Sequence, residues 1–578
     1  MFSETNPGTL ARALPWAVVA AVRGTAFAEP APTSSPRGLR HTFASSRRIW
    51  CTHLVFWLTF LVATGTGLVR NRSLFLIPKY PWADSALNSL LVIRAEHLTQ
   101  LVGNYSRVGF HHPGPALFYV LAAGEVLFRD VLGVVPSPYN GQLLGVSVYV
   151  GAMIALAMVS LYRTSRSLGA TAIAFGLVFL FAARQGMFIQ DWFPYLHMSA
   201  FLLFIVAGAG LAAGRTSEVP LYVLGASLLA HGHVSFLLFV GVTTAVVVAG
   251  WWLCHRGAVR AEVGAHRTGL IGAAALLFIL LLPLFLELAF NYPGPWDLYW
   301  NYLQHGTLAP RSLWDVLAFV GASWTKLHIP TVIFVVAGIV AVALTLTEGH
   351  REMRRLFISL YGMLILQTML TGYYVLRGVD RLSPIREYGY VTLFYEMVPV
   401  VLMAAAAAQL WIRLRQVLAV RISGASYAVR MAPAGAVALL VAVAATNPAL
   451  SNRGSSNSNY ASIVQMLRSS PARAGRPVGL IEDQSSAWTA ASGIGVQMRR
   501  VGLPWCLDQA APISIVQYTS TYVCHGAGAR WTVHATLERP PPRVLTLWSG
   551  WIVDQHLTLY EVPKVLAPVM AYGGPSVG

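Results

Sequence analysis

Apolar runs of about 20 residues recur along the chain and alternate with short polar connections. A run of this length crosses a hydrocarbon core ~30 Å thick, and the lack of water there forces its backbone into a helix. The pattern therefore predicts an α-helical polytopic membrane protein with about eleven transmembrane helices. The predicted spans lie near Cys51–Val69, Leu143–Leu161, Thr171–Phe181, Ala200–Ala213, Tyr222–Leu229, Val234–Leu253, Leu270–Leu288, Thr331–Leu346, Phe357–Leu370, Val391–Leu410 and Ala434–Ala445.

The charges in the connections orient these helices. With the N-terminus inside, every cytoplasmic connection contains arginine, as the positive-inside rule requires. These connections are Arg163–Arg166, the turn at Arg215, His255–Arg267, His350–Arg355 and Arg413–Arg430. An odd number of crossings then leaves the segment 449–578 outside the membrane.

The segment 449–578 differs from the rest because it is polar and has short strand-like stretches. We expect strands around Val478–Ile481 and Val533–Leu537 and a helix near Ala487–Met498, which together make a small extracytoplasmic α/β domain. Cys506 and Cys524 lie in this segment, in a compartment where a disulfide can persist. Sequence spacing alone cannot establish the geometry of a bridge, so their pairing stays open.

The residues before the first span allow two interpretations. Ala13–Ala28, followed by Glu29, has the small-residue end of a secretory signal, but Arg23 interrupts the apolar region. We therefore expect residues 1–48 to be a cytoplasmic tail, or to follow a misassigned start codon. Residues 49–448 then form the transmembrane domain.

Composition agrees with a membrane protein, since 56% of the residues are apolar and 11% are charged. The net charge of +18 could indicate a nucleic-acid partner, but no basic stripe interleaved with aromatic residues occurs outside the short connections. The charge fits membrane topology and contact with anionic lipids instead. The four cysteines form neither a CxxC pair nor a cluster with zinc-ligand spacing, which argues against a structural metal site.

The first outer loop, residues 70–142, is too long for a simple connector, and such loops usually carry function. Its stretch Trp82–Arg94 places leucines at helical spacing with Asp84 near the N-cap, and it predicts an amphipathic helix lying on the membrane. The stretch Pro115–Val131 is apolar but is interrupted by polar residues, which favours the membrane interface over a crossing.

The order of elements along the chain resembles the GT-C class of membrane glycosyltransferases. It consists of one span, a loop with two interfacial helices, further spans and an outer domain. The segment Asn104–Tyr119, NYSRVGFHHPGPALFY, is similar to the YSRxGxxHPGPxxFY signature of an actinobacterial-type branch of that class. The resemblance covers the first outer loop, fades through the later spans and returns weakly around Ala487–Leu507.

This resemblance implies transfer of a sugar from a polyprenyl-phosphate donor to a glycan, lipid or protein acceptor, with inversion at the anomeric carbon. It implies cell-envelope biosynthesis in a bacterial cytoplasmic membrane, with the active site on the extracytoplasmic face. The partners would be the lipid-linked sugar, membrane lipids and the acceptor, without nucleic acid.

In such enzymes a carboxylate early in the first outer loop serves as the base, and Asp84 matches that position. A carboxylate can accept the proton that an attacking hydroxyl loses, although Asp84 could instead only cap a helix. Asp191, in the next outer loop, is a second acidic candidate. The sequence departs from the pattern there, because Phe193 stands where related proteins carry asparagine before the proline.

Cationic and polar residues on the outer side are candidates for binding the substrate. Arginine suits a leaving phosphate, whereas the alternative role is contact with anionic lipid headgroups. The histidines could bind the acceptor or the phosphate, or could be structural, and Glu396 should face the bundle interior. The candidates are Arg94, Tyr105, Arg107, His111, His112, His233, Arg377, Arg381 and Arg386.

The sequence leaves other readings open. His231 and His233 do not share a helix face, which disfavours a metal site between them, and no certain cofactor is indicated. A divalent cation, magnesium or manganese, at Asp84 and Asp191 stays open. A transporter or flippase of lipid-linked precursors also needs many spans, but no internal repeat supports it. A non-catalytic assembly protein on the same fold is the third reading.

Overall fold

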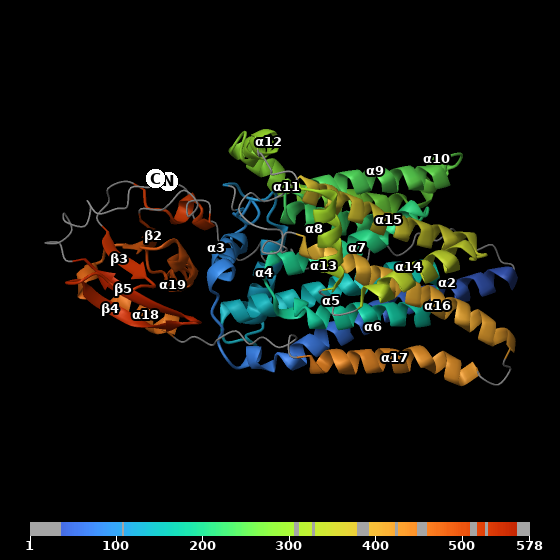
Figure 1. Ribbon diagram of the computed structural model, residues 1–578, viewed down its shortest axis with the longest axis horizontal. Coiled ribbons are helices and arrows are strands. Elements are labelled where there is room, and N and C mark those ends of the chain that lie inside the picture. Colours follow the sequence, from blue (N-terminus) through green and yellow to red (C-terminus); the bar gives the residue numbers. More distant parts are fainter. Residues whose placement is uncertain are drawn as a thin grey trace.

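The computed structural model is a bundle of helices with a small sheet domain at one end (Figure 1). It describes residues 36–106, 109–305, 311–325, 330–377, 392–421, 426–447, 459–508, 517–525 and 530–562. Arg107, Arg381, Arg386 and the signal-like segment lie outside these residues. The transmembrane part contains α2 (Pro36–Arg70), α3 (Ala83–Glu96), α4 (Ala116–Glu125), α5 (Pro138–Ser165), α6 (Leu168–Arg184), α7 (Phe193–Ala212), α8 (Val219–Gly232), α9 (Phe236–Cys254), α10 (Val259–Ala265), α11 (Arg267–Phe290), α12 (Pro295–His305), α13 (Leu313–Thr325), α14 (Thr331–Leu346), α15 (Arg351–Leu376), α16 (Met397–Arg421) and α17 (Ser426–Thr446).

Each predicted span coincides with a helix, and the protein is a multi-pass membrane protein. In the described chain, 7 helices are long and apolar enough to cross a bilayer. These are Ile49–Arg70 of α2, α5, α7, α9, α11, α15 and Leu393–Leu418, which includes most of α16. The apolar parts of α6, α14 and α17 are shorter, and α8 has only 14 residues. The number of eleven crossings therefore stays a prediction.

The spanning helices differ sharply in what surrounds them. In α7, 89% of the most apolar stretch is buried inside the protein, whereas in α11 the share is 6%. α7 packs against α5, α8 and α15, and α11 presents its side chains outward. Both are apolar all round, because lipid and protein interior demand the same side chains.

The connections that carry arginine lie together at the end of the bundle opposite the sheet domain (Figure 1). Arg215, between α7 and α8, donates to the carbonyl oxygen of Arg163 at 3.0 Å and pairs with Glu352 at 3.1 Å. These contacts join the connections that the charge pattern assigned to one side. Which side of the membrane they occupy stays a prediction.

The C-terminal part is the α/β domain expected from the sequence. It consists of α18 (Asn459–Ser469), β1 (Val478–Glu482), α19 (Trp488–Arg500), β2 (Trp505–Leu507), β3 (Trp531–Thr536), β4 (Leu545–Ile552) and β5 (Gln555–Glu561). The sheet order is β2-β1-β3-β5-β4. β1 runs parallel to β2 and β3, and β5 is antiparallel to β3 and β4. The predicted strands and helix correspond to β1, β3 and α19, while the others were not predicted.

Cys506 and Cys524 form a disulfide, with Cα atoms 5.0 Å apart. The bridge ties β2 to the segment that follows the 3-10 helix Ser520–Tyr522. It therefore holds the neighbouring 3-10 helix, whose Thr521 and Tyr522 contact α3, close to the sheet.

A helix forms at Trp82–Arg94 as predicted, but the prediction that it lies on the membrane surface was wrong. The helix exists as α3, but it packs against α19 on one side and α4 on the other. Leu87 and Leu90 belong to an apolar cluster with the C-terminal domain, whereas Leu91 and Val92 belong to the core of the bundle. A helix that is apolar on two faces is buried rather than laid on a surface.

The prediction that the stretch Pro115–Val131 lies in the membrane interface fits only its second half. Its first half is α4, whose Leu117 and Phe118 are buried in the bundle core. Its second half is a π-helix, Val126–Val131, without a buried residue. Only this second half has the exposure expected of an interfacial segment.

Candidate active site

Asp84 lies in the first turn of α3 and faces the motif loop. The Tyr105 hydroxyl donates a short hydrogen bond to its Oδ1 atom. The N-cap of α3 is Trp82, whose side chain makes no capping hydrogen bond, so Asp84 lies in the first turn and not at the N-cap position. Ala83, directly before it, has φ of 49°, a conformation that costs about 1–3 kcal/mol and clusters at functional sites.

Asp191 reaches the same place from the start of α7. Its Oδ1 atom accepts a hydrogen bond from the Ser85 hydroxyl at 2.8 Å and from the Tyr139 hydroxyl at 3.2 Å. Its Oδ2 atom is buried and has no hydrogen-bond partner among the residues that the structure describes. Burial raises the pKa of Asp191 to about 6, and the Ser85 and Tyr139 hydrogen bonds oppose this while the Asp84 charge adds to it. The two sequence candidates thus lie beside each other.

The motif loop is a clamped hairpin. The backbone N–H of Gly103 donates to the carbonyl of His112 at 2.8 Å, and the N–H of His112 donates to Asn104 at 2.7 Å. Tyr105 and His111 form an antiparallel bridge, and Gly109 supplies a φ of 92° at the tip. The hairpin therefore holds Tyr105 at a fixed place beside α3.

Histidines attach this hairpin to α8. The ring centroids of His112 and His233 lie 4.1 Å apart, and the N–H of Val234 donates to Nδ1 of His112 at 3.4 Å. The Gly114 N–H donates to the His231 carbonyl at 3.0 Å. A Cβ on Gly114 would lie 2.2 Å from Nδ1 of His231, which accounts for the glycine of the motif.

The loop histidines are held neutral by their surroundings. Burial lowers the pKa of His111 to about 4, with a hydrogen bond to the Gly103 carbonyl acting against it and the Arg94 charge adding to it. Burial lowers the pKa of His233 to about 4. The pKa of His112 falls well below its ordinary value through burial and the neighbouring histidines. At neutral pH these rings can donate or accept a hydrogen bond but carry no charge.

A short helix that the sequence analysis missed also contacts the motif. The Tyr299 hydroxyl of α12 donates to the His111 carbonyl at 2.5 Å, and its ring lies 5.0 Å from that of Phe110. The aromatic positions Trp296, Tyr299 and Trp300 are typical of an interfacial helix, and this pattern could have revealed it.

The arginine candidates that the structure describes are Arg94 and Arg377, and Arg94 lies away from Asp84. Arg94 lies ten positions further along α3, about 15 Å by helical rise. Its guanidinium donates to the Thr521 hydroxyl at 3.0 Å and to the Thr99 carbonyl at 3.4 Å. Arg377 is exposed at the end of α15. Their roles in binding substrate stay predictions, as do those of the residues outside the described chain.

Two further features concern charge in the bundle. Glu396 is 3% exposed and accepts a hydrogen bond from Gln185 at 3.0 Å, which confirms that it faces the interior. Within the described ranges, no three His, Cys, Asp or Glu side chains are grouped so that they could hold a metal ion. Asp84 and Asp191 together offer two carboxylates, which is the number that magnesium commonly takes from protein beside substrate phosphates and water.

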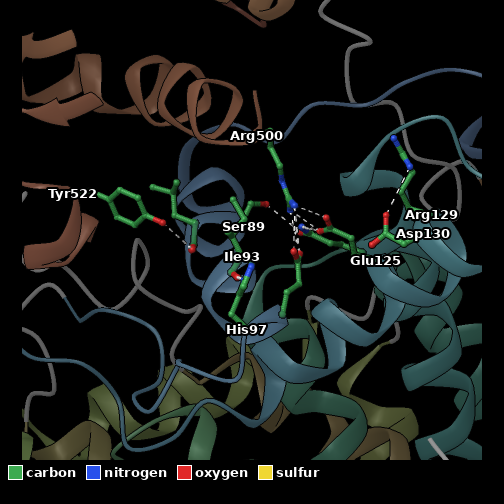
Figure 2. A network of polar contacts seen from close by, with 11 residues as sticks. Ser89, Ile93, His97, Glu125, Arg129, Asp130, Arg500 and Tyr522 are labelled. Atoms are coloured by element: carbon green, nitrogen blue, oxygen red, sulfur yellow. Dashed lines mark hydrogen bonds and ion pairs between the residues drawn. The ribbon is translucent and has the colours of Figure 1, made fainter. Parts of the chain in front are cut away.

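A second polar cluster joins the C-terminal domain to the ends of α3 and α4 (Figure 2). Arg500, the last residue of α19, pairs with Glu125 at 2.6 Å and with Glu96 at 3.3 Å. Gln142 of α5 donates to Glu125 at 2.8 Å and accepts from Ser89 at 3.1 Å. Burial raises the pKa of Glu125, while the Arg500 guanidinium acts against that rise.

The sequence analysis missed several of these residues. Ser85, Tyr139 and Arg500 carry no motif that distinguishes them from ordinary polar residues. Their partners lie far away in sequence, with 106 positions between Ser85 and Asp191 and 375 between Glu125 and Arg500. Only the fold brings them together.

No family model and no curated protein sequence matches the chain. Among solved structures it is similar to ArnT from Cupriavidus metallidurans bound to undecaprenyl phosphate, at 11% identity over 93% of this chain and 100% of that chain, with a TM-score of 0.49. The apo state of that protein gives 13% identity over 92% and 100%, with a TM-score of 0.40. The archaeal oligosaccharyltransferase AglB from Archaeoglobus fulgidus, in complex with an inhibitory peptide and a dolichol-phosphate, gives 12% identity over 77% and 64%, with a TM-score of 0.33.

Proposed function

We propose that this protein is a membrane glycosyltransferase that moves a sugar from a polyprenyl-phosphate donor to an extracytoplasmic acceptor, with Asp84 as the general base. One observation carries the proposal. Asp84, at the position where the GT-C resemblance expects the base, is hydrogen-bonded to the motif residue Tyr105 and lies beside the second acidic candidate, Asp191. A carboxylate pair at a helix end next to a specific motif is more than a capping arrangement.

In the proposed reaction the acceptor hydroxyl gives its proton to Asp84 as its oxygen forms a bond to the anomeric carbon. The bond between that carbon and the donor phosphate breaks, and its electron pair leaves with the polyprenyl phosphate. Attack opposite the leaving group inverts the configuration at that carbon. A positioned general base typically accelerates such a step by about 10²–10⁴-fold.

The leaving phosphate needs donors of positive charge or hydrogen bonds. Arg107, between Tyr105 and His111 in the motif, is the first candidate, with Arg377 and Arg381 as further ones. His112 and His233 are neutral donors beside the same hairpin. Arg94 is assigned a lesser part in substrate binding, since its guanidinium already donates to the C-terminal domain.

A divalent cation would be held by Asp191, through its unpartnered Oδ2 atom, together with Asp84. Such an ion would supply positive charge for the leaving phosphate. Titration of Mn²⁺ into the solubilised protein, followed by electron paramagnetic resonance, tests this. Loss of binding in Asp191→Asn supports the site, and no binding in the wild type excludes it.

Activity is tested with the purified protein in lipid nanodiscs and a panel of synthetic polyprenyl-phosphate sugars. Lipid and glycan profiles of a deletion strain then name the donor that accumulates and the glycan that is truncated. A protein that moves a lipid-linked sugar across the bilayer without transferring it would instead be the flippase considered above.

The location of the site in a bacterial cytoplasmic membrane, facing outward, is part of the same proposal. Alkaline phosphatase fused after Gly578 should be active, because the arginine-bearing connections and the sheet domain lie at opposite ends of the bundle. An inactive fusion together with an active cytoplasmic reporter would overturn the orientation.

A further inference from the structure

One arginine of the C-terminal domain reaches two carboxyl groups of the first outer loop (Figure 2). Arg500, the last residue of α19, contacts the two oxygens of Glu125 at 2.6 and 2.7 Å and Glu96 at 3.3 Å. Glu96 ends α3 and Glu125 ends α4. The cluster therefore joins three helix ends, and it carries one more negative than positive charge when both carboxyls are ionised.

This cluster is one end of a longer contact between α19 and α3. At the other end, the Ser492 hydroxyl donates to the carbonyl of Ala83 at 3.5 Å. Between the two ends, Val496 of α19 belongs to the same apolar cluster as Leu87 of α3. The contact is thus apolar along most of its length and ionic at Arg500, where its strength depends on the charge of the partners.

Glu125 is enclosed by the bundle rather than by the C-terminal domain. It is 2% exposed, and its helix α4 packs against α3 and α5. Gln142 of α5 donates to its carboxylate at 2.8 Å. The C-terminal domain adds the guanidinium of Arg500. When the end of α19 moves away, Glu125 therefore remains enclosed by α3 and α5 but loses its cation.

The surroundings of Glu125 act on its pKa in opposite directions. Burial raises the pKa, and the Glu96 carboxyl adds to that rise, whereas the Arg500 guanidinium and the Gln142 hydrogen bond lower it. The result is a pKa above the ordinary value of a glutamate. Loss of Arg500 raises it further, so the undocked state binds a proton more readily than the docked state. By linkage, docking is favoured at high pH and is lost as pH falls through the docked-state pKa.

Other titratable side chains on the surrounding elements bond elsewhere. Arg129 and Asp130, on the π-helix that follows Glu125, pair with each other at 3.7 Å. Those on the neighbouring helices bond to the 3-10 helix Ser520–Tyr522, to α3, to the first turn of α4 or to Asp191, and they are Arg94, Arg499, His97, His231 and Tyr139. The pH response of the cluster therefore belongs to Glu125, with Glu96 and Arg500 beside it.

We infer that Arg500, Glu96 and Glu125 form a proton-operated latch: ionised Glu125 holds the end of α19 against α3, and protonation of Glu125 releases it. Glu96 stays within reach of Arg500 in the protonated state, so the domain loosens at this end and does not detach. The inference concerns docking and does not rest on the proposed role of Asp84. The latch acts, however, on the helix that carries Asp84 in its first turn.

The test compares hydrogen exchange in the wild type and in Glu125→Gln, as full-length proteins in lipid nanodiscs. The readout is the exchange rate at residues 92–96 and 496–500, the last turns of α3 and α19. Glutamine keeps the size of the side chain and an oxygen for Gln142, but it carries no charge. At about pH 8.5 we expect exchange about ten-fold faster in the variant, because a charge-assisted contact is lost. Near pH ~5.5 the ratio of the two rates should approach one, since the wild type is then protonated as well.

Three further variants separate the members of the cluster. Arg500→Gln removes the cation from the domain side, and it should match Glu125→Gln at every pH. Glu96→Gln should move the pH response of the wild type to lower pH, because the Glu96 carboxyl raises the pKa of Glu125. Asp130→Asn is the control, since this aspartate is adjacent but well exposed, and it should behave as the wild type.

Two results would overturn the latch. A rate ratio of about one between Glu125→Gln and the wild type at high pH would mean that the ionised carboxyl does not hold the domain. A ratio that stays near ten at low pH would mean that protonation does not release it. Arg500→Gln gives the same two outcomes if Glu125→Gln does not fold. No substrate enters these measurements, so their failure and the failure of the proposed function are distinguishable.

Discussion

Two polar clusters lie at the same end of the bundle and differ in how completely their charges are paired. Around Glu125, two prongs of Arg500 and an amide from Gln142 satisfy the carboxylate. Around Asp191, two hydroxyls donate to one oxygen, and the other oxygen has no hydrogen-bond partner within the described part of the chain. A buried charge that is fully paired holds elements together, whereas one that is left partly open is available to a ligand.

We expect the largest effect from a substitution in the paired cluster around Glu125, and we expect it on the stability of the fold. Arg500→Ala leaves Glu125 buried without its cation, and such a loss typically costs about 3–5 kcal/mol. Without the guanidinium, the folded-state pKa of Glu125 rises further above its unfolded value. The free energy of unfolding of the variant therefore falls as pH rises through this folded-state pKa, because the buried carboxyl must then carry an unpaired charge. The free energy of unfolding, from denaturant titration in detergent, should drop by about 3 kcal/mol at pH 8.5 and by less at pH 6.

Arg129 provides the matched control. Its pair with Asp130 spans 3.7 Å and both side chains are well exposed, as Figure 2 shows beside the Arg500 cluster. Exposed pairs of this kind contribute about 0–1 kcal/mol. If Arg129→Ala destabilises the protein as much as Arg500→Ala, the paired cluster has no special structural part.

The open cluster should show its effect on turnover. Asp84→Asn keeps the size of the side chain and can still accept the Tyr105 hydrogen bond, but it cannot take a proton. Transfer should fall by at least ~10²-fold, with membrane insertion and donor binding unchanged. Asp130→Asn, at an exposed aspartate, should keep full activity. An Asp84→Asn protein that transfers sugar at nearly the normal rate would remove Asp84 from the mechanism.

Arg107 tests whether the hairpin of the open cluster holds the donor. Arg107→Ala should weaken donor binding by about 2 kcal/mol, the usual size of a lost charge-assisted contact. Arg107→Lys should restore it only partly, because the forked geometry is missing. Binding is measured by isothermal titration with a non-hydrolysable lipid-phosphate analogue. Unchanged affinity with a lower melting temperature would make this arginine structural.

We expect the smallest effect from Asp191→Asn. It should stabilise the fold, whereas Arg500→Ala should destabilise it. A folded-state pKa near 6 against about 3.9 when unfolded destabilises the charged form by about 3 kcal/mol, so stability falls as pH rises from about 4 through 6. Asp191→Asn removes this penalty but buries an amide without an acceptor, which returns about 1–2 kcal/mol. We expect a net gain of about 1 kcal/mol at pH 8 with reduced transfer. A destabilised variant would mean that the paired oxygen matters more than the open one.

The sequence predicted the helices of the bundle well, because apolar length is a local property that lipid demands directly. It proposed Tyr105, His111 and His112 as candidates through one contiguous motif, and Asp84 through its position early in the first outer loop. It misjudged the position of α3, since Leu87 and Leu91 have the same period whether they face lipid, a bundle or a second domain. The partners Ser85 with Asp191, and Glu125 with Arg500, depend on contacts between distant segments that no local pattern encodes.

The same limit applies to α7 and α11. Both are long and apolar enough to cross a bilayer, yet one is enclosed by protein and the other is not. Asp191 gains its raised pKa from its place at the start of the enclosed helix. Hydropathy alone assigns the two helices no difference in function.

The contacts between α3 and the C-terminal domain join residues more than 400 positions apart in the sequence, as with Arg94 and Thr521 or Leu90 and Tyr522. Contacts of such high order form late, because the chain between them must be made and inserted first. The apolar cluster that joins Leu87 and Tyr105 to Tyr518 and Tyr522 is therefore complete only after the C-terminal domain has been synthesised. A chain whose synthesis stops early would therefore carry its motif but lack the side chains that cover Leu87 and Leu90 of α3, and would leave this apolar face open to water.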